Sequence, residues 1–473
     1  MLLSELLIQR LKQQMKSKSI ILLILFYIPV IIFSQDKGNL VVIGDSLIGK
    51  VVDGENVREV IGNVLMTQDE VRITCDRAIQ FIKKNEAELI GNVIVTQDTI
   101  RITTSRGFYN GNKKIAFSSN GIRLTDGHYK LNSKTGYYYF DENRSFFTGE
   151  VNLYDNETRL TSDTLYYYDN ENKAIGKGNV KIDSKSSILI ADSLVNYRET
   201  EITFAYNNVV IADKKESMLI LSDYLEDNKH TGNSKIEGNP LLVQVDTLDN
   251  GNLDTLYIKS VSMESFKDST KNVLIAKDSV NIFSKNLNSV NSETFFDQLS
   301  GEIRFKKKEE DLTQPVLWYS YSQLSGDSIN IRLKDKKLEN IKVFGNSMLI
   351  STNEKYPERY EQISGDSLFL FFMNDTLNNV EVIGKILSIY YLFDEGEGNG
   401  VLKSSGERMK IGFEDGSVGE VKLYGSPATE YYPDQKIIGK ERDFLLPTFN
   451  RFDRPVKKIF DRKIPFNLLE VKK

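Results

Sequence analysis

Cysteine and histidine are almost absent from this sequence of 473 residues. Cys75 is the single cysteine, so no disulfide can form within the chain. No cysteine stands directly after the N-terminal apolar run, which excludes the acylated cysteine of a bacterial lipoprotein. His128 and His230 are the only histidines, and no Cys-x-x-Cys pair accompanies them. Zinc sites need several such ligands. The sequence therefore predicts no metal site and no cofactor.

Long apolar runs are missing from all but the N-terminal part of the chain. The exception is residues 20–33, which follow a basic cluster and end at Ser34, where the chain turns polar. This order is typical of a signal peptide. The run contains Pro29 and is shorter than the roughly 20 residues that span a bilayer. We predict a signal peptide over residues 1–34, with an uncleaved inner-membrane anchor as the alternative.

A basic excess is also lacking. The chain has 61 Lys and Arg against 66 Asp and Glu, a formal net charge of −5. A nucleic-acid partner would require a basic stripe, so the sequence predicts none. Only 9 residues are proline and 40% are hydrophobic, which excludes collagen-like and disordered chains. The chain can bury a core.

A repeat of about 29 residues runs through the first half of the chain. Its mark is a Gly/Asn pair before a β-branched residue, found at Gly62-Asn63-Val64, Gly91-Asn92-Val93, Gly149-Glu150-Val151, Gly178-Asn179-Val180 and Asn207-Asn208-Val209. We interpret each pair as a turn that precedes a strand. Apolar and polar residues alternate after each pair, as in a strand with one buried face. Polar turns such as residues 169–172 separate further strands. The sequence predicts an all-β fold of stacked antiparallel hairpins, because units of fixed period bury their faces against one another.

The period loosens after about residue 240. Ser325-Gly326-Asp327-Ser328 and Ser364-Gly365-Asp366-Ser367 lie about 39 residues apart. We therefore predict a first array over residues 35–240 and a second, looser array over residues 241–440. A basic C-terminal tail, residues 441–473, contains Pro and Phe without strand alternation. We expect it to pack along the body as an extended segment, with a docking arm as the alternative.

Two motifs imitate catalytic chemistry. Residues 44–47, Gly-Asp-Ser-Leu, spell the motif of GDSL esterases, and Asp227 with His230 could complete a triad. However, Gly-Asp-Ser recurs at residues 326–328 and 365–367, and the helices of such a hydrolase are missing. A GDSL-type esterase remains a minor alternative. We predict a chain that is not an enzyme and has no catalytic residues.

A series of aspartates recurs at one phase of the repeat, with Ser or Thr beside most of them. Such carboxylates could bind calcium, but short side chains at this position more often bond their own backbone at a turn. We predict turn capping for Asp76, Asp163, Asp192, Asp223, Asp327 and Asp366.

The repeated phrases resemble the OstA-like family. They include Ile61-Gly62-Asn63-Val64, Gly178-Asn179-Val180 and the strand of residues 160–167, Leu-Thr-Ser-Asp-Thr-Leu-Tyr-Tyr. The resemblance covers residues 37–240 well and the second array more loosely. It implies an antiparallel β-jellyroll, or open "β-taco", whose apolar interior holds the acyl chains of lipid A. It further implies a periplasmic role in lipopolysaccharide transport and outer-membrane assembly, as for LptA. Implied partners are lipopolysaccharide and other Lpt-type envelope proteins joined through edge strands, or further copies of this chain.

Six alternating apolar residues are our candidates for the lipid groove. They are Val151, Leu153, Val180, Ile182, Ile188 and Ile190. The same positions could equally belong to an ordinary hydrophobic core. An exported structural or adhesive β-solenoid is the alternative function.

Overall fold

The computed structural model describes residues 40–473, except for residues 53, 248–250, 252, 286, 308–313, 335–336, 374–375, 415, 456–461 and 470–473. The chain divides into two units, Met1–Asn39 and Leu40–Lys473. The signal peptide predicted over residues 1–34 lies outside the described part. Within that part, no helix is both long and apolar enough to cross a bilayer.

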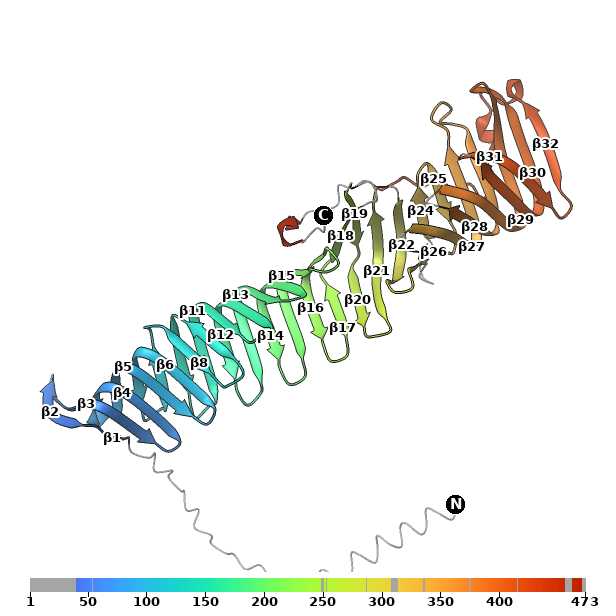
Figure 1. Ribbon diagram of the computed structural model, residues 1–473. Helices are drawn as coiled ribbons and strands as arrows, with labels where there is room; N and C mark the ends of the chain where they lie inside the picture. The colour runs from blue at the N-terminus through green and yellow to red at the C-terminus, as the bar shows by residue number, and fades with distance from the viewer. Residues whose placement is uncertain are drawn as a thin grey trace, which may run out of the picture. The chain divides into compact units, whose positions relative to one another are not determined.

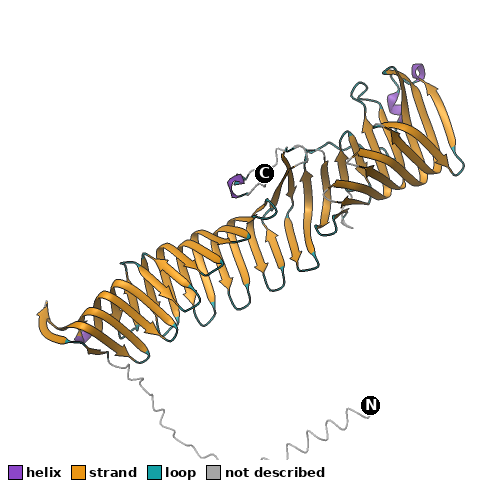
Figure 2. Ribbon diagram, viewed as in Figure 1, coloured by secondary structure: helices purple, strands orange, loops and turns teal. Residues whose placement is uncertain are grey.

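The described residues of the second unit form one sheet of antiparallel strands (Figures 1 and 2). The strands up to residue 237 are β1 (Val41–Ile43), β2 (Ser46–Val52), β3 (Glu55–Gln68), β4 (Val71–Phe81), β5 (Glu86–Gln97), β6 (Ile100–Asn110), β7 (Ile115–Ser118), β8 (Ile122–Thr125), β9 (Lys130–Ser133), β10 (Thr135–Tyr139), β11 (Arg144–Tyr154), β12 (Thr158–Tyr168), β13 (Lys173–Ser184), β14 (Ser187–Tyr197), β15 (Ile202–Asp213), β16 (Met218–Asn228) and β17 (Asn233–Glu237).

The sheet continues without interruption through the rest of the unit. Its further strands are β18 (Leu241–Thr247), β19 (Leu253–Lys259), β20 (Ser262–Lys267), β21 (Asn272–Phe283), β22 (Leu287–Asp297), β23 (Glu302–Lys306), β24 (Val316–Tyr319), β25 (Ser322–Ser325), β26 (Ser328–Lys334), β27 (Lys337–Thr352), β28 (Tyr360–Met373), β29 (Thr376–Asp394), β30 (Glu397–Glu414), β31 (Ser417–Tyr424) and β32 (Ala428–Pro433). Short 3-10 turns are η1 (Ile82–Lys84), η2 (Asp434–Lys436), η3 (Glu441–Phe444) and η4 (Phe466–Leu468). The predicted all-β fold of stacked antiparallel strands is confirmed. The division at residue 240 stays a prediction, and strand pairing crosses it, because β16 pairs with both β17 and β18.

The Gly/Asn pairs lie inside strands, so the prediction that they form turns between strands was wrong. In β5, Gly91 and Asn92 both have positive φ, 73° and 44°, and the register with β4 and β6 shifts around them. Gly178 and Asn179 also have positive φ within β13, and the register between β13 and β12 shifts around them. Two successive residues in the left-handed region form a bulge that redirects the strand. The repeat therefore marks a hinge that each long strand crosses, and the tight turns lie at the strand ends.

The hinge divides the sheet into two walls. The part of the sheet that carries the turns at residues 69–70, 98–99 and 185–186 is called the first wall. The part that carries the turns at residues 111–114 and 198–201 is called the second wall. The two walls face each other, since apolar residues of both pack into one buried cluster. Val95 in the first wall and Leu89 in the second belong to it and are 3% and 1% exposed. The core lies between the walls and follows the sheet along the chain.

The C-terminal tail packs on the outer face of the first wall, as expected for an extended segment. Ile464, Leu468 and Leu469 contact a buried cluster that includes Leu219 and Val243. Nearer the end of the sheet, Leu446 and Phe449 belong to a cluster with Ile350 and Tyr391. These strands are apolar on both faces because the tail covers the outer one. The boundary at residue 441 stays a prediction.

Candidate functional site

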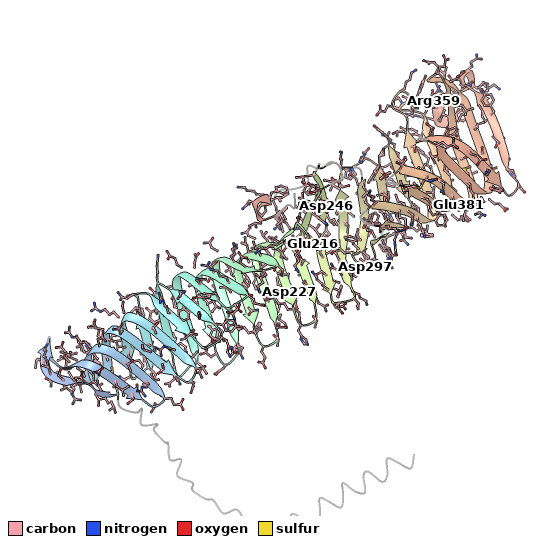
Figure 3. The ribbon with its side chains drawn as sticks, in the orientation of Figure 1. Glu216, Asp227, Asp246, Asp297, Arg359 and Glu381 are labelled. Atoms are coloured by element: carbon pink, nitrogen blue, oxygen red, sulfur yellow. The ribbon has the colours of Figure 1, made fainter. Side chains whose placement is uncertain are left out.

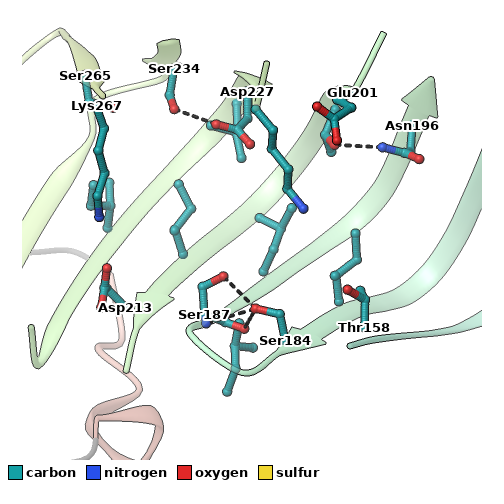
Figure 4. A pocket seen from close by; sticks show the side chains of 18 of the residues that line it. Thr158, Ser184, Ser187, Asn196, Glu201, Asp213, Asp227, Ser234, Ser265 and Lys267 are labelled. Atoms are coloured by element: carbon teal, nitrogen blue, oxygen red, sulfur yellow. Dashed lines mark hydrogen bonds between the residues drawn. The ribbon is translucent and has the colours of Figure 1, made fainter. Parts of the chain in front are cut away.

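An open groove of about 500 Å³ lies between the two walls near the middle of the sheet. Its lining runs from Tyr129 to Gln298 and comes from both walls (Figure 4). Volumes of this size are typical of small-molecule sites. The groove has an apolar floor near the hinge and a polar rim at the mouth, so it suits a molecule with an apolar and a polar part.

The floor is a row of apolar side chains on the first wall. Each member lies directly opposite the next on the neighbouring strand, which is the closest side-chain spacing a sheet offers. The members that line the groove, in order, are Leu153, Leu160, Ile182, Leu189, Ile211, Ile220 and Leu242. The row continues in both directions, with Ile102, Leu124 and Leu131 before it and Ile258 and Ile282 after it. Cross-strand register thus builds one apolar stripe from residues far apart in the sequence.

The mouth on the second wall is polar. Asn196, Thr203, Asp227, Ser234 and Ser265 occupy successive opposite positions there. Asn196 donates to the Thr203 hydroxyl at 3.0 Å, and the Ser234 hydroxyl donates to Asp227 at 2.6 Å (Figure 4). Asn196 thus satisfies Thr203, and Ser234 satisfies Asp227.

Charges of opposite sign face each other across the mouth. On the first wall, Asp155 and Asp213 accept hydrogen bonds from backbone N–H groups of their own turns at 2.7 and 2.8 Å. The backbone N–H of Glu216 donates to Asp213 at 3.1 Å, and Glu216, labelled in Figure 3, lines the same groove. On the second wall, Lys229 and Lys267 line the groove, and the Lys267 side chain points across it towards Asp213 (Figure 4). The mouth is therefore hydrated and charged while the floor is apolar.

An aromatic and carboxylate cluster flanks the groove towards the N-terminal strands. The Tyr138 hydroxyl donates to Asp169 at 2.6 Å. Burial raises the pKa of Asp169, although the bond from Tyr138 opposes this shift. Burial also raises the pKa of Tyr167. Arg198 stacks on Tyr167, with its guanidinium carbon 4.7 Å from the ring centroid. The cluster is built from paired groups and offers no exposed nucleophile.

The six predicted groove residues divide into three pairs. Leu153 and Ile182 line the groove, while Val151 and Val180, each 1% exposed, are buried in the core beneath it. Ile188 lines the groove but belongs to the cluster that contacts the tail, and Ile190 packs against that same cluster. The lipid contacts of all six stay a prediction.

The sequence-based prediction missed much of the floor. Leu160, Leu189, Ile211, Ile220 and Leu242 were not singled out, yet all line the groove. Residues 188–190, 209–211 and 219–221 are apolar at every position, so alternation cannot tell which face is inside. The signal that could have found most of them is the repeat itself. Leu160, Leu189 and Ile220 each lie three residues before a recurring aspartate, and Ile211 lies three residues after the hinge asparagine Asn208, as Ile182 does after Asn179.

The recurring aspartates accept hydrogen bonds at the hinge. The prediction that they bond the backbone of their own turn was therefore wrong about their partner. Asp76, Asp163 and Asp192 each accept a hydrogen bond of 2.9 Å from an asparagine side chain of the neighbouring strand, Asn92, Asn179 and Asn208. At most of these sites a glycine stands next to the carboxylate, although Asn207 takes that place beside Asp192. A Cβ at Gly91 or Gly178 would lie 2.3 Å from the aspartate Oδ2. Within the described residues, no group of acidic, histidine or cysteine side chains could hold a metal ion.

The Gly-Asp-Ser motif is this same hinge element. Asn63 donates to Asp45 at 2.9 Å, as Asn346 donates to Asp327 at 3.1 Å. Ser46 lies on β2, which pairs with β3, whereas Asp227 and His230 belong to the β16–β17 hairpin. The structure therefore does not bring the three residues of the supposed triad together.

The family model described as OstA-like protein matches residues 40–192. The match is confined to residues 40–192. The resemblance inferred from the repeats is confirmed over this OstA-like segment and stays a prediction for residues 193–440.

No curated protein matches the chain. Among solved structures, the chain is similar to LptH of Pseudomonas aeruginosa, described as the LptA-homologous periplasmic component of the lipopolysaccharide transport device. That match has 15% identity and a TM-score of 0.15, and it covers 28% of this chain and 77% of LptH.

Proposed function

We propose that this chain is a non-enzymatic, lipopolysaccharide-binding transport protein of the periplasm that contributes to outer-membrane assembly. The observation that carries the proposal is the apolar row under an open polar mouth, in a chain whose residues 40–192 are OstA-like. Each methylene removed from water gains about 0.8 kcal/mol, so acyl chains on the floor bind without any catalytic group. The sugar and phosphate part of the lipid stays at the polar rim. The chain acts after export, or from an inner-membrane tether if residues 1–34 are retained.

We further propose that the two ends of the sheet join partners. Among the described strands, β2 pairs only with β3, and its Leu47 and Val51 are 57% and 69% exposed. At the other end β32 pairs only with β30 among those strands, and its Tyr431 is 52% exposed. An unpaired edge offers backbone groups to a strand of another chain. Other Lpt-type envelope proteins or further copies of this chain would extend the sheet there.

Binding of lipopolysaccharide to residues 35–473 tests the proposal. A fluorescent lipid A probe is bound to the protein and displaced with unlabelled lipopolysaccharide. We expect saturable binding and full displacement. A folded protein, checked by its β-type circular dichroism, that binds neither lipid would contradict the proposal and favour the structural β-solenoid. Lack of labelling of Ser46 by a fluorophosphonate is the expected result for a chain that is not an esterase.

A further inference from the structure

The two walls touch each other on the N-terminal side of the groove. The Tyr109 hydroxyl donates to Gln68 Oε1, and Gln68 Nε2 donates to the Gly111 carbonyl, both at 2.9 Å. Lys114 forms an ion pair of 2.7 Å with Asp69. Gln68 and Asp69 belong to the first wall, and their partners belong to the second. Gln68 is 2% exposed, so these contacts close the mouth at this point.

A second contact between the walls stands at the edge of the groove. Tyr129, in a turn of the first wall, lies under the guanidinium of Arg198, in a turn of the second wall, at 3.8 Å from ring centroid to Cζ. Arg198 also donates to the Tyr167 hydroxyl at 3.2 Å. The arginine is thus held between rings of both walls by cation–π contacts.

A third contact closes the mouth on the C-terminal side. Tyr319 ends β24 on the first wall, and Phe372 lies near the end of β28 on the second wall. Their rings meet edge to face, with centroids 5.4 Å apart. Both side chains pack with the core cluster. The groove lies between this contact and the Tyr129–Arg198 contact, and its lining ends at Gln298.

We propose that the mouth between the Tyr129–Arg198 and Tyr319–Phe372 contacts is a lateral window, through which a lipid with several acyl chains is loaded sideways. The inference rests on the proposed function and goes beyond it by naming where the ligand gains access. Loading along the groove from an end of the sheet would carry the polar head group under contacts that close the mouth, and burying such a group costs free energy. Loading through the window leaves the head group in water at the charged rim while the acyl chains reach the floor.

Locking the window tests this inference. Asp213→Cys and Lys267→Cys place thiols on opposite walls, where Lys267 points towards Asp213 (Figure 4). A short bis-maleimide with a cleavable disulfide then bridges the walls of the exported chain. Cys75 does not compete, because it is buried and burial raises the pKa of its thiol to about 11. The association rate of the fluorescent lipid A probe is measured before bridging, after bridging and after reduction.

We expect bridging to slow association at least tenfold and reduction to restore it. The matched control bridges Asp69→Cys to Lys114→Cys, where the walls already touch, and we expect its association rate to stay within twofold. Capping both window cysteines with N-ethylmaleimide adds bulk at the mouth without joining the two walls. We expect the association rate of the capped protein to stay within threefold of the rate before capping. Equal rates in the bridged and unbridged window variant would overturn the window. Absence of saturable binding in the unbridged protein would instead overturn the proposed function.

Discussion

The guanidinium of Arg462 donates a hydrogen bond of 2.8 Å to the carboxylate of Asp223, although 239 positions separate the two residues in the chain. The same side chain donates to the carbonyls of Ser222 and Gly238 at 2.9 and 2.8 Å. These three acceptors lie at the hinge, so Arg462 fixes the tail to the line along which the two walls meet.

Arg462→Ala should loosen the tail. Hydrogen bonds of charged groups contribute about 1.5–3 kcal/mol, less where solvent reaches them. We expect amide exchange in residues 462–469 to accelerate roughly tenfold, since about 1.4 kcal/mol corresponds to that factor. Mass spectrometry of exchanged peptides measures it. Arg451→Ala, which removes a single bond to the Tyr360 hydroxyl, should leave residues 462–469 unchanged, and equal acceleration in both variants would refute the anchoring role.

Gly178→Ala should destabilise the fold by about 2 kcal/mol, because a side chain at positive φ is strained and overlap adds to the strain. The glycine has φ 74°, and an added Cβ would lie 2.3 Å from Asp163 Oδ2. Urea unfolding followed by circular dichroism measures the change. At Gly412 an added Cβ meets nothing within 4 Å, so Gly412→Ala should stay within about 0.5 kcal/mol. A neutral result at Gly178 would show that the hinge tolerates other backbone conformations.

Ile182→Asp should weaken binding of the fluorescent lipid A probe at least tenfold, because a charge in the apolar row must be desolvated by an acyl chain. Ile182 lines the groove and lies opposite Leu160 and Leu189. Equilibrium titration measures the dissociation constant. Thr161→Asp is the matched control on the adjacent strand, since alternation places Thr161 on the other face of the sheet. Its affinity should stay within twofold; an equal loss in both variants would argue against the row as the binding surface.

Glu361 should make the fold less stable as the pH rises. Burial raises the pKa of this carboxyl above its ordinary value, so the unfolded chain loses the proton at a lower pH than the folded chain. The stability is therefore highest below the ordinary carboxyl pKa and falls as the pH increases through the raised one. Glu361→Gln should be more stable than the parent at pH 8, and the difference should vanish near pH 4. Thermal unfolding at both values checks this, and an unchanged difference would show that ionisation of Glu361 is not the cause.

The sequence by itself determined the strand class, the repeat and the positions of most hinge residues. Gly and Asn recur at fixed spacing because both tolerate positive φ, and the aspartate that bonds the asparagine recurs with them, so these positions can be found without a structure. Even so, the sequence could not distinguish a turn between strands from a bulge within one, because both use the same residues.

Only the tertiary structure decided which face of the central strands is the inner one. Strands such as β14 and β16 are apolar at successive positions because Leu189 and Ile220 face the groove while Leu219 and Leu221 pack in the cluster that the tail contacts. The alternation of apolar and polar residues cannot separate these two environments, since both remove the side chain from water. The contacts between the walls, such as Gln68 with Tyr109, likewise follow from folding at the hinge and from no periodicity along the chain.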